Sequence, residues 1–197
     1  MDTTVLKSAL IMQPQNRNRH HFMIFGGFLL KQTFELAFTC AAAFAHARPT
    51  FVSLDPSTFD NPVPVGSILY LTATVVYTDP PLIGAGDEAT DENSKYTRVQ
   101  VRVNTKVRDV EHGRSKPTGT SASLCFHLAP GVLKLRAAPG IFNYTFTVEK
   151  DIRVMPRTYQ EFMMYLEARR RAAEMKETMK EEGLGMSPEA ADANVTE

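Results

Sequence analysis

The chain has 197 residues, a length typical of one domain, and its 22 Lys and Arg residues balance its 22 Asp and Glu residues. This balance excludes a whole-protein field that would gather nucleic acid or a membrane surface, so an anionic ligand needs a local site. The two cysteines, Cys40 and Cys125, are too few for a disulfide framework. We therefore expect one globular domain with a tail, from a reducing compartment.

The N-terminal part of the chain raises the question of a membrane span or a targeting signal. Residues 4–12 have the composition of a strand, and residues 22–47 form a strongly apolar run. Lys31 and Glu35 interrupt this run, so its uninterrupted part is well short of the roughly 20 residues that cross a bilayer. Because Asp2 is acidic and a strand follows it, we expect neither a presequence in this chain nor a membrane span.

Residues 28–45 contain no Gly or Pro and are rich in Leu, Phe and Ala, which predicts a helix. Apolar residues cover nearly the whole circumference, so we expect this helix to be buried. Glu35 is its one acidic residue. Because an unpaired buried carboxylate is costly, Glu35 is either functional or paired with Arg17 or Arg19 of the preceding loop.

Beyond the helix, the hydrophobic period changes to that of strands. Residues 61–66 (NPVPVG) and 79–94 resemble surface connections without catalytic character. The strand-like segments are residues 51–59, 67–77, 96–110 and 142–148. A buried helix followed by long antiparallel strands predicts an α+β protein with a single hotdog fold, in which an antiparallel sheet wraps around a long central helix.

The C-terminal part predicts a second helix. Thr158 and Glu161 have the spacing of a capping box. An apolar stripe follows and fades into charge; it consists of Phe162, Met163, Tyr165, Leu166 and Ala173. We place the domain at residues 1–167, and a solvated helix end with a disordered tail at residues 168–197.

Several motifs agree in order with one known family. They are IMQPQNRNRHHFMIFGGFLLKQTFELAF, RPTFVSLDPSTFDNPVPVGSILYL and VMPRTYQEFMMYLEARR, within residues 8–171. These motifs resemble the hotdog acyl-CoA thioesterases of the mitochondrial thioesterase 9 type. The resemblance implies a mitochondrial thioester hydrolase that converts fatty acyl-CoA to free acid and coenzyme A without a cofactor. It also implies a site built where two hotdog units pack together.

The resemblance assigns four catalytic residues. Asn18 matches the family's loop asparagine, Gly26 and Gly27 match its Gly-Gly, and Glu35 matches its helix carboxylate. The chemistry fits, because a helix N-terminus stabilises an oxyanion, a carboxylate activates water, and Asn18 positions that water or binds the carbonyl. The chain departs from the family in its spacer HHFM, which is one residue longer. Taken alone, Gly-Gly before a helix is more often turn or packing geometry.

Residues 120–140 have no counterpart in the family pattern. Our hypothesis is a retained intron translated in frame, or else a lineage-specific loop. The chain holds one hotdog unit where the family usually has two, which predicts homodimerisation or pairing with a related chain. An inactive hotdog domain that dimerises or binds acyl-CoA is the alternative, and a hotdog hydratase ranks below it. His20 and His21 lack the further ligands of a metal site.

Overall fold

The computed structural model describes residues 1–19, 23–58, 61–79, 96–109, 115–117, 120–121 and 138–181. The helices are η1 (Asp2–Thr4), η2 (Pro14–Asn16), α1 (Gly26–Ala45) and α2 (Tyr159–Glu181). The strands are β1 (Leu6–Ile11), β2 (Thr50–Leu54), β3 (Ser57–Thr58), β4 (Ile68–Asp79), β5 (Thr97–Arg108), β6 (Ser115–Pro117), β7 (Thr120–Ser121), β8 (Ala138–Pro139) and β9 (Ile141–Val148).

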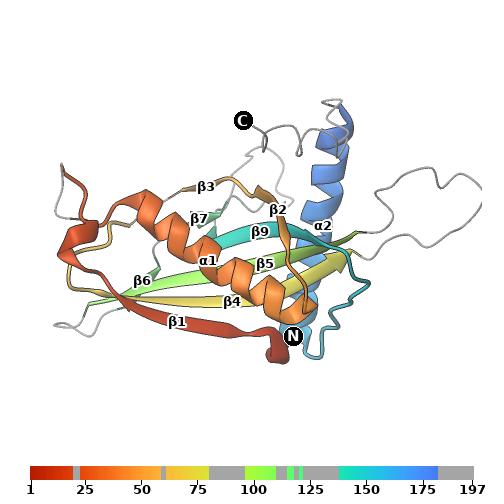
Figure 1. Ribbon diagram of the computed structural model, residues 1–197, viewed down its shortest axis with the longest axis horizontal. Coiled ribbons are helices and arrows are strands. Elements are labelled where there is room, and N and C mark those ends of the chain that lie inside the picture. Colours follow the sequence, from red (N-terminus) through yellow and green to blue (C-terminus); the bar gives the residue numbers. More distant parts are fainter. Residues whose placement is uncertain are drawn as a thin grey trace, which may run out of the picture.

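The main sheet is antiparallel, and its strand order is β1-β4-β5-β9-β2, with β6 paired to β5. The sheet lies along α1, and α2 crosses behind β4, β5 and β9 (Figure 1). This arrangement confirms the predicted α+β architecture of a sheet around a central helix. It leaves β2 as one edge strand and β1 as the other.

The core lies between α1 and the inward face of the sheet. One side of α1 is buried at helical spacing, by Leu29, Thr33, Ala37, Cys40, Ala41 and Ala45. Ala37 and Ala41 are fully buried, and such small side chains bring the helix close to the strands. Burial raises the pKa of the Cys40 thiol to about 11, which makes it a packing residue rather than a nucleophile.

The expectation that α1 is buried all round is wrong for this single chain. Gly27, Lys31, Glu35, Thr39 and Ala43 form an exposed ridge along the side that faces away from the sheet. By length and composition α1 could cross a membrane. It packs on the sheet, however, and the core helix of a folded domain can have the same length and composition. The nearly apolar circumference of α1 therefore does not mean that the whole helix is buried, because a single sheet layer leaves one of its sides uncovered.

The strand expected over residues 96–110 is β5, in which Gln100 is buried along with the valines. Val99, Val101 and Val103 of β5 are fully buried on the α1 side, and Arg98 and Arg102 alternate with them. The strand predicted over residues 51–59 is divided into β2 and β3 at Asp55 and Pro56. Proline explains the division, because it donates no hydrogen bond to a strand ladder.

Short strands flank most of the segment at residues 120–140. Ser121 of β7 pairs with Ala138 of β8, and β7 also pairs with β3 in a separate three-stranded sheet. Residues 122–137 lie outside the described residues. The hypothesis of a retained intron or an added loop therefore stays a prediction, as does the disordered tail, which lies beyond residue 181.

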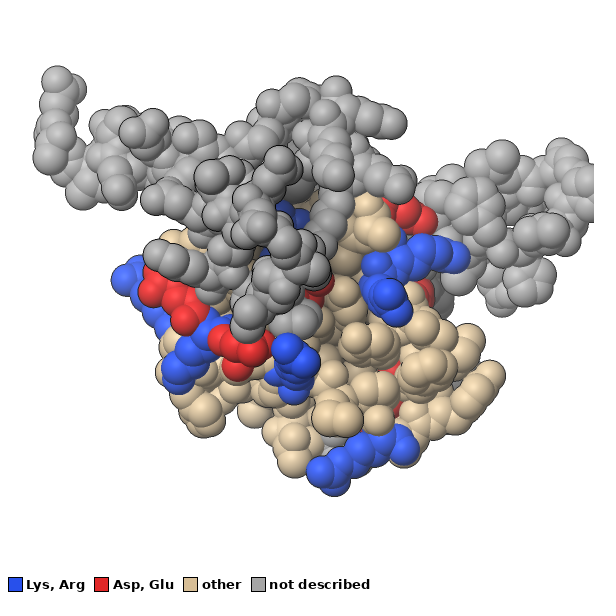
Figure 2. All heavy atoms as spheres, turned by 90° about the vertical axis from the view of Figure 1, so that its right-hand side faces the viewer, with Lys and Arg blue, Asp and Glu red and all other residues tan. Residues whose placement is uncertain are grey.

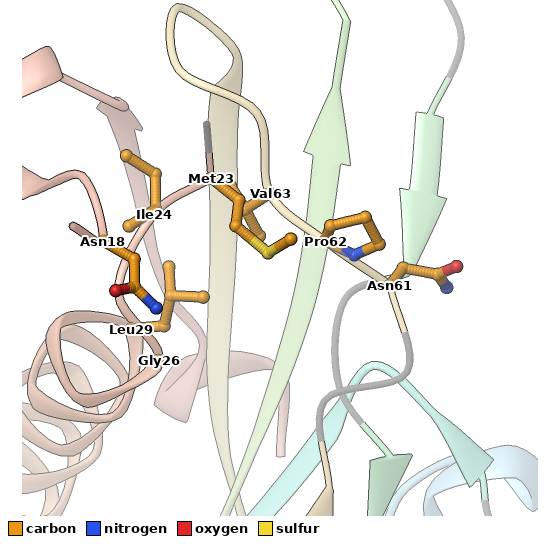
Figure 3. A pocket seen from close by; sticks show the side chains of 8 residues that line it. All are labelled: Asn18, Met23, Ile24, Gly26, Leu29, Asn61, Pro62 and Val63. Atoms are coloured by element: carbon orange, nitrogen blue, oxygen red, sulfur yellow. The ribbon is translucent and has the colours of Figure 1, made fainter. Parts of the chain in front are cut away.

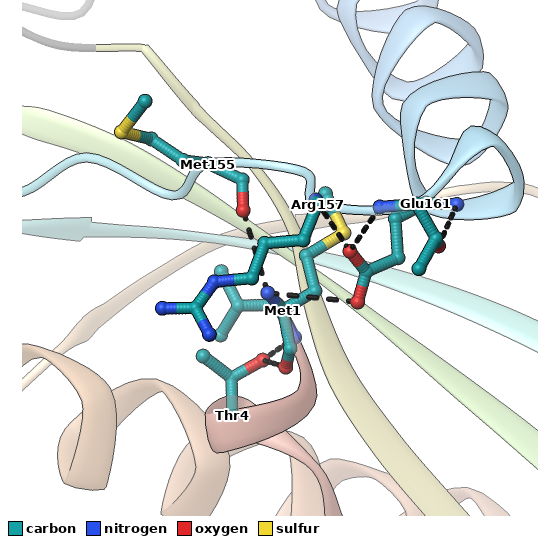
Figure 4. A network of polar contacts seen from close by, with 7 residues as sticks. Met1, Thr4, Met155, Arg157 and Glu161 are labelled. Carbon is teal, nitrogen blue, oxygen red and sulfur yellow. Dashed lines mark hydrogen bonds and ion pairs between the residues drawn. The ribbon is translucent and has the colours of Figure 1, made fainter.

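The capping box of α2 is confirmed (Figure 4). The Glu161 backbone N–H donates to Thr158 Oγ1 at 3.3 Å, and the Glu161 carboxylate accepts from the backbone N–H groups of Arg157 at 2.7 Å and Thr158 at 3.2 Å. The Met1 ammonium lies 3.6 Å from Glu161 Oε1. Glu161 thus fixes the start of α2 and joins it to the first residue of the described chain.

Replacing Glu161 with alanine should lower the free energy of unfolding by about 1–2 kcal/mol, because two partly buried backbone N–H groups at the start of α2 lose their acceptor. Urea unfolding followed by circular dichroism measures this loss. Glu174→Ala is the matched control, since Glu174 pairs with Arg170 at 3.5 Å while both side chains are 41% exposed. Equal losses for the two variants would show that the cap does not stabilise α2.

The packed part of α2 extends past residue 167, where we had placed the end of the domain. Ala168 and Ala172 are buried against Val76 and Tyr77 of β4. Arg171 is also buried, so at least one turn of α2 beyond residue 167 is packed, and the domain boundary itself stays a prediction.

The inner side of α2 also carries ion pairs. Arg171 Nε lies 3.4 Å from Asp55 Oδ2, and Arg102 Nη1 lies 3.4 Å from Glu167 Oε2. Desolvation raises the pKa of the Asp55 carboxyl, although Arg171 and Asn143 act in the opposite direction. Replacing one member of this network would leave a buried charge without its partner.

Most of the predicted apolar stripe of α2 faces solvent, whereas its Tyr165 packs against Tyr77 of β4 with ring centroids 5.2 Å apart. Phe162 is 46% exposed, Met163 is 48% exposed and Leu166 is 39% exposed. The side of α2 toward the sheet carries buried alanines and charged residues together with Met164 and Tyr165. On the side of the molecule shown in Figure 2, charged side chains of both signs surround a broad uncharged area.

Candidate active site at the start of helix α1

The loop before α1 folds back on the start of the helix. The Asn18 backbone N–H donates to Met23 O at 2.8 Å, and the Phe25 N–H donates to Asn16 O at 3.0 Å. An isolated bridge joins Arg17 to Ile24. These bonds fix Asn18 beside the helix start, while most of the long spacer HHFM lies outside the described residues.

Gly26 and Gly27 are the first residues of α1, as the family resemblance implies. Phe25 precedes them in extended backbone conformation, and no side chain caps the helix. The first amides of a helix lack intrahelical acceptors and carry the positive end of its dipole. A Cβ on Gly27 would lie 2.5 Å from Cε1 of Phe25, so glycine lets this exposed ring lie next to the helix start.

A cavity of about 320 Å³ opens at this helix start (Figure 3). Its lining residues are Asn18, Met23, Ile24, Gly26, Leu29, Asn61, Pro62 and Val63. The Asn18 side chain points toward Leu29 and the first turn of α1. Polar groups that converge beside an apolar wall are typical of a small-molecule site.

The turn at residues 61–66 supplies part of the cavity wall, which the sequence did not indicate. The Ile24 N–H donates to Val63 O at 2.9 Å, and Met23 pairs with Pro64 in an isolated bridge. The sequence predicted only a surface connection here. Its prolines indicate a stiff turn, but they do not show which distant residues the turn contacts.

Glu35 lies outside this cavity. It follows Gly27 by eight positions on the same helix, which corresponds to about 12 Å along the axis. Its side chain is 53% exposed, pairs with Lys31 Nζ at 3.7 Å and accepts from Gln32 Nε2 at 3.1 Å. The expectation of a desolvated carboxylate is therefore wrong for one chain, and the observed partner is neither Arg17 nor Arg19.

An aromatic cluster joins the neighbourhood of Glu35 to the edge strand β2. The Phe34 ring packs edge-on against Phe51 of β2, with centroids 5.4 Å apart, and against Tyr144 at 5.9 Å. The Tyr144 hydroxyl lies 2.6 Å from Thr33 Oγ1, which fixes it under α1. Phe51 is 46% exposed, so the cluster reaches the surface at the sheet edge.

Across the part of the chain that the structure describes, no group of three or more His, Cys, Asp or Glu residues could hold a metal ion. His20 and His21 lie outside the described residues. The site is therefore built from an asparagine, the helix start and an apolar wall.

Comparisons with known proteins agree on the fold. No protein-family model matches the chain. An apo hexameric acyl-CoA thioesterase has a TM-score of 0.66 and 19% identity, with 90% of this chain and 94% of that chain covered. The Staphylococcus aureus acyl-CoA hydrolase, solved with butyryl coenzyme A, coenzyme A and coenzyme A disulfide, has a TM-score of 0.62 and 21% identity, with 94% and 98% covered. The chain thus has the hotdog fold that these structures represent.

A curated relative narrows the assignment. Human mitochondrial acyl-coenzyme A thioesterase 9 is 32% identical over 171 residues, which cover 86% of this chain. The same residues match 30% of that relative, so the chain spans under a third of its length. The chain is therefore similar in sequence to part of a mitochondrial acyl-CoA thioesterase, and it has the hotdog fold.

Proposed function

We propose that this protein hydrolyses fatty acyl-CoA to free fatty acid and coenzyme A. One observation carries the proposal: Asn18 and the start of α1 meet the apolar wall of a single cavity. A thioester needs this combination, with donors for the carbonyl oxygen and an apolar surface for the acyl chain.

The proposed mechanism assigns a role to each residue. The backbone N–H groups of Gly26 and Gly27 stabilise the negative charge on the carbonyl oxygen, and Asn18 holds the carbonyl or the attacking water. The water oxygen bonds to the carbonyl carbon, and Glu35 accepts a proton from the water in the same step. The C–S bond then breaks, and the proton passes to the thiolate of coenzyme A.

The Glu35 that serves a given cavity comes from a second hotdog unit in this proposal. About 12 Å separates Gly27 from Glu35 along α1, so one chain cannot place both on one carbonyl. Phe34, next to Glu35, packs on the edge strand β2, whose outer edge has no strand beside it among the described residues. Pairing of two such edges about a two-fold axis would extend the sheet and place the two α1 helices antiparallel on one of its faces.

Thiol release from acyl-CoA esters of increasing chain length, measured on protein of known native mass, tests the proposal. We expect a dimer or larger assembly that releases thiol above the buffer rate. Asn18→Ala should lower kcat/KM by about 10²-fold or more, as expected for loss of one oxyanion donor. An active monomer would contradict the shared site, and no release from any ester would contradict hydrolysis.

The alternative is a hotdog domain that assembles or binds acyl-CoA without hydrolysing it. The position of Glu35 favours this alternative, because its side chain is exposed, pairs with Lys31 and lies outside the cavity at the start of α1. Binding of acyl-CoA without thiol release would support it. For localisation we propose the mitochondrion, on the ground that the relative that matches 86% of this chain is mitochondrial.

A further inference from the structure

The outward face of α2 carries the largest exposed apolar residues of any described helix. Tyr159, Phe162, Met163 and Leu166 are 77%, 46%, 48% and 39% exposed, and Met155, which precedes the helix, is 76% exposed. The four helical residues have the spacing i, i+3, i+4 and i+7, so they form one continuous stripe. We call these four residues the α2 stripe.

The stripe is not directed toward the protein's own sheet. Ala168, Arg171 and Ala172 occupy the opposite side of α2 and are buried. Two ion pairs hold that side in place: Arg171 pairs with Asp55, and Glu167 pairs with Arg102. Rotating the helix to bury the stripe would break these pairs, so the apolar face is a fixed feature of the surface.

Basic residues border the stripe at both ends. Arg157 precedes it, Arg169 and Arg170 follow it, and all three are exposed. The acidic residues of the same region are engaged elsewhere: Glu161 is buried in the cap, Glu167 lies 3.6 Å from Arg171, and Asp79 accepts from the Tyr77 hydroxyl at 3.4 Å. Glu174 offsets Arg170, from which it lies 3.5 Å, so Arg157 and Arg169 leave a local positive charge beside the apolar face.

We propose that α2 docks on an anionic lipid surface. An in-plane helix on such a surface needs an apolar face with aromatic residues and a basic border, and α2 has both. The Tyr159 ring, apolar with a polar tip, suits the boundary between head groups and acyl chains. This surface is independent of the cavity at α1, so it does not depend on the proposed hydrolysis.

A second copy of the chain fits the same surface less well. A two-fold antiparallel contact along the stripe would bring Arg157 of one copy close to Arg169 and Arg170 of the other. Like charges in contact oppose association, whereas the same arginines attract anionic head groups. The charge around the stripe thus selects the lipid surface.

Flotation with vesicles tests this proposal on the full chain. One vesicle set contains phosphatidylcholine alone, and the other contains phosphatidylcholine with phosphatidylglycerol. We expect the protein to float with the anionic set only and to be partly released by salt. Arg169→Glu should weaken partitioning by about 25-fold, since each unit of charge contributes about fivefold. Lys7→Glu, the same change at an exposed position of β1, should have little effect.

The double substitution Phe162→Ser and Leu166→Ser tests the apolar face. It should lower partitioning by about tenfold or more, while hydrolysis of a water-soluble short-chain acyl-CoA and the circular dichroism spectrum stay unchanged. Equal binding to both vesicle sets, or to neither, would overturn the proposal. A third outcome would also overturn the proposal: the parent chain binds no vesicles and the double variant has a lower native mass than the parent. The stripe would then join copies of this chain.

Discussion

Replacing Glu35 with glutamine should lower kcat for acyl-CoA hydrolysis by about 10²- to 10⁴-fold, because the amide cannot accept a proton from water. The fold should be unaffected, since the side chain is on the exposed ridge of α1. Lys31→Gln is the matched control: it removes the ion-pair partner of Glu35 and keeps the carboxylate. An unchanged rate for Glu35→Gln would exclude this residue as the base.

Mixed dimers show whether the site is shared. Chains carrying Asn18→Ala and chains carrying Glu35→Gln would be co-expressed with different affinity tags, and the mixed dimer purified. Each pure variant lacks one group at every site, whereas the mixed dimer has one intact site of two and should recover about half of the parent rate. No recovery would mean that Asn18 and Glu35 of the same chain act together.

Replacing Phe146 with alanine should lower the free energy of unfolding by about 3–5 kcal/mol, the range for deleting a fully buried aromatic side chain. Phe146 has no exposed surface, and its ring lies against four aromatic rings of α1, β2 and β9. The deletion would therefore leave a cavity between the helix and the sheet. Urea unfolding at fixed protein concentration measures the loss.

Phe51→Ala is the matched control for this prediction, because Phe51 belongs to the same cluster but is 46% exposed. It should lose about 1 kcal/mol in the monomer, in proportion to its smaller burial. Phe146→Leu keeps most of the volume and should lose less than Phe146→Ala, which provides a measurable variant should the alanine protein fail to fold. Similar losses for Phe146→Ala and Phe51→Ala in monomeric protein would contradict the packing described here.

Local signals in the sequence predicted most of the fold. The central helix was expected over residues 28–45 and spans Gly26–Ala45, and Thr158 with Glu161 forms the expected capping box. The strand-like segment at residues 96–110 predicted β5, which spans Thr97–Arg108. These features depend on residues a few positions apart, which is why one sequence suffices to predict them.

Features that depend on distant residues were not predictable. The apolar circumference of α1 did not reveal that one ridge, including Glu35, lies outside the monomer core. The contact of the turn at Val63 with Ile24 joins segments that no periodic pattern connects. The rotation of α2 depends on buried charges such as Asp55 and Arg171, and hydrophobic spacing alone favoured the opposite face.

The pairing of β7 with β8 has a consequence for engineering. Because Ser121 and Ala138 are register partners, whatever chain connects them begins and ends at neighbouring points. Doubling the length of such a connection adds only about 0.6 kcal/mol of closure entropy. Residues 122–137 are therefore the natural place to exchange for an epitope or a labelling peptide, which would report on the protein while α1 and the main sheet keep their packing.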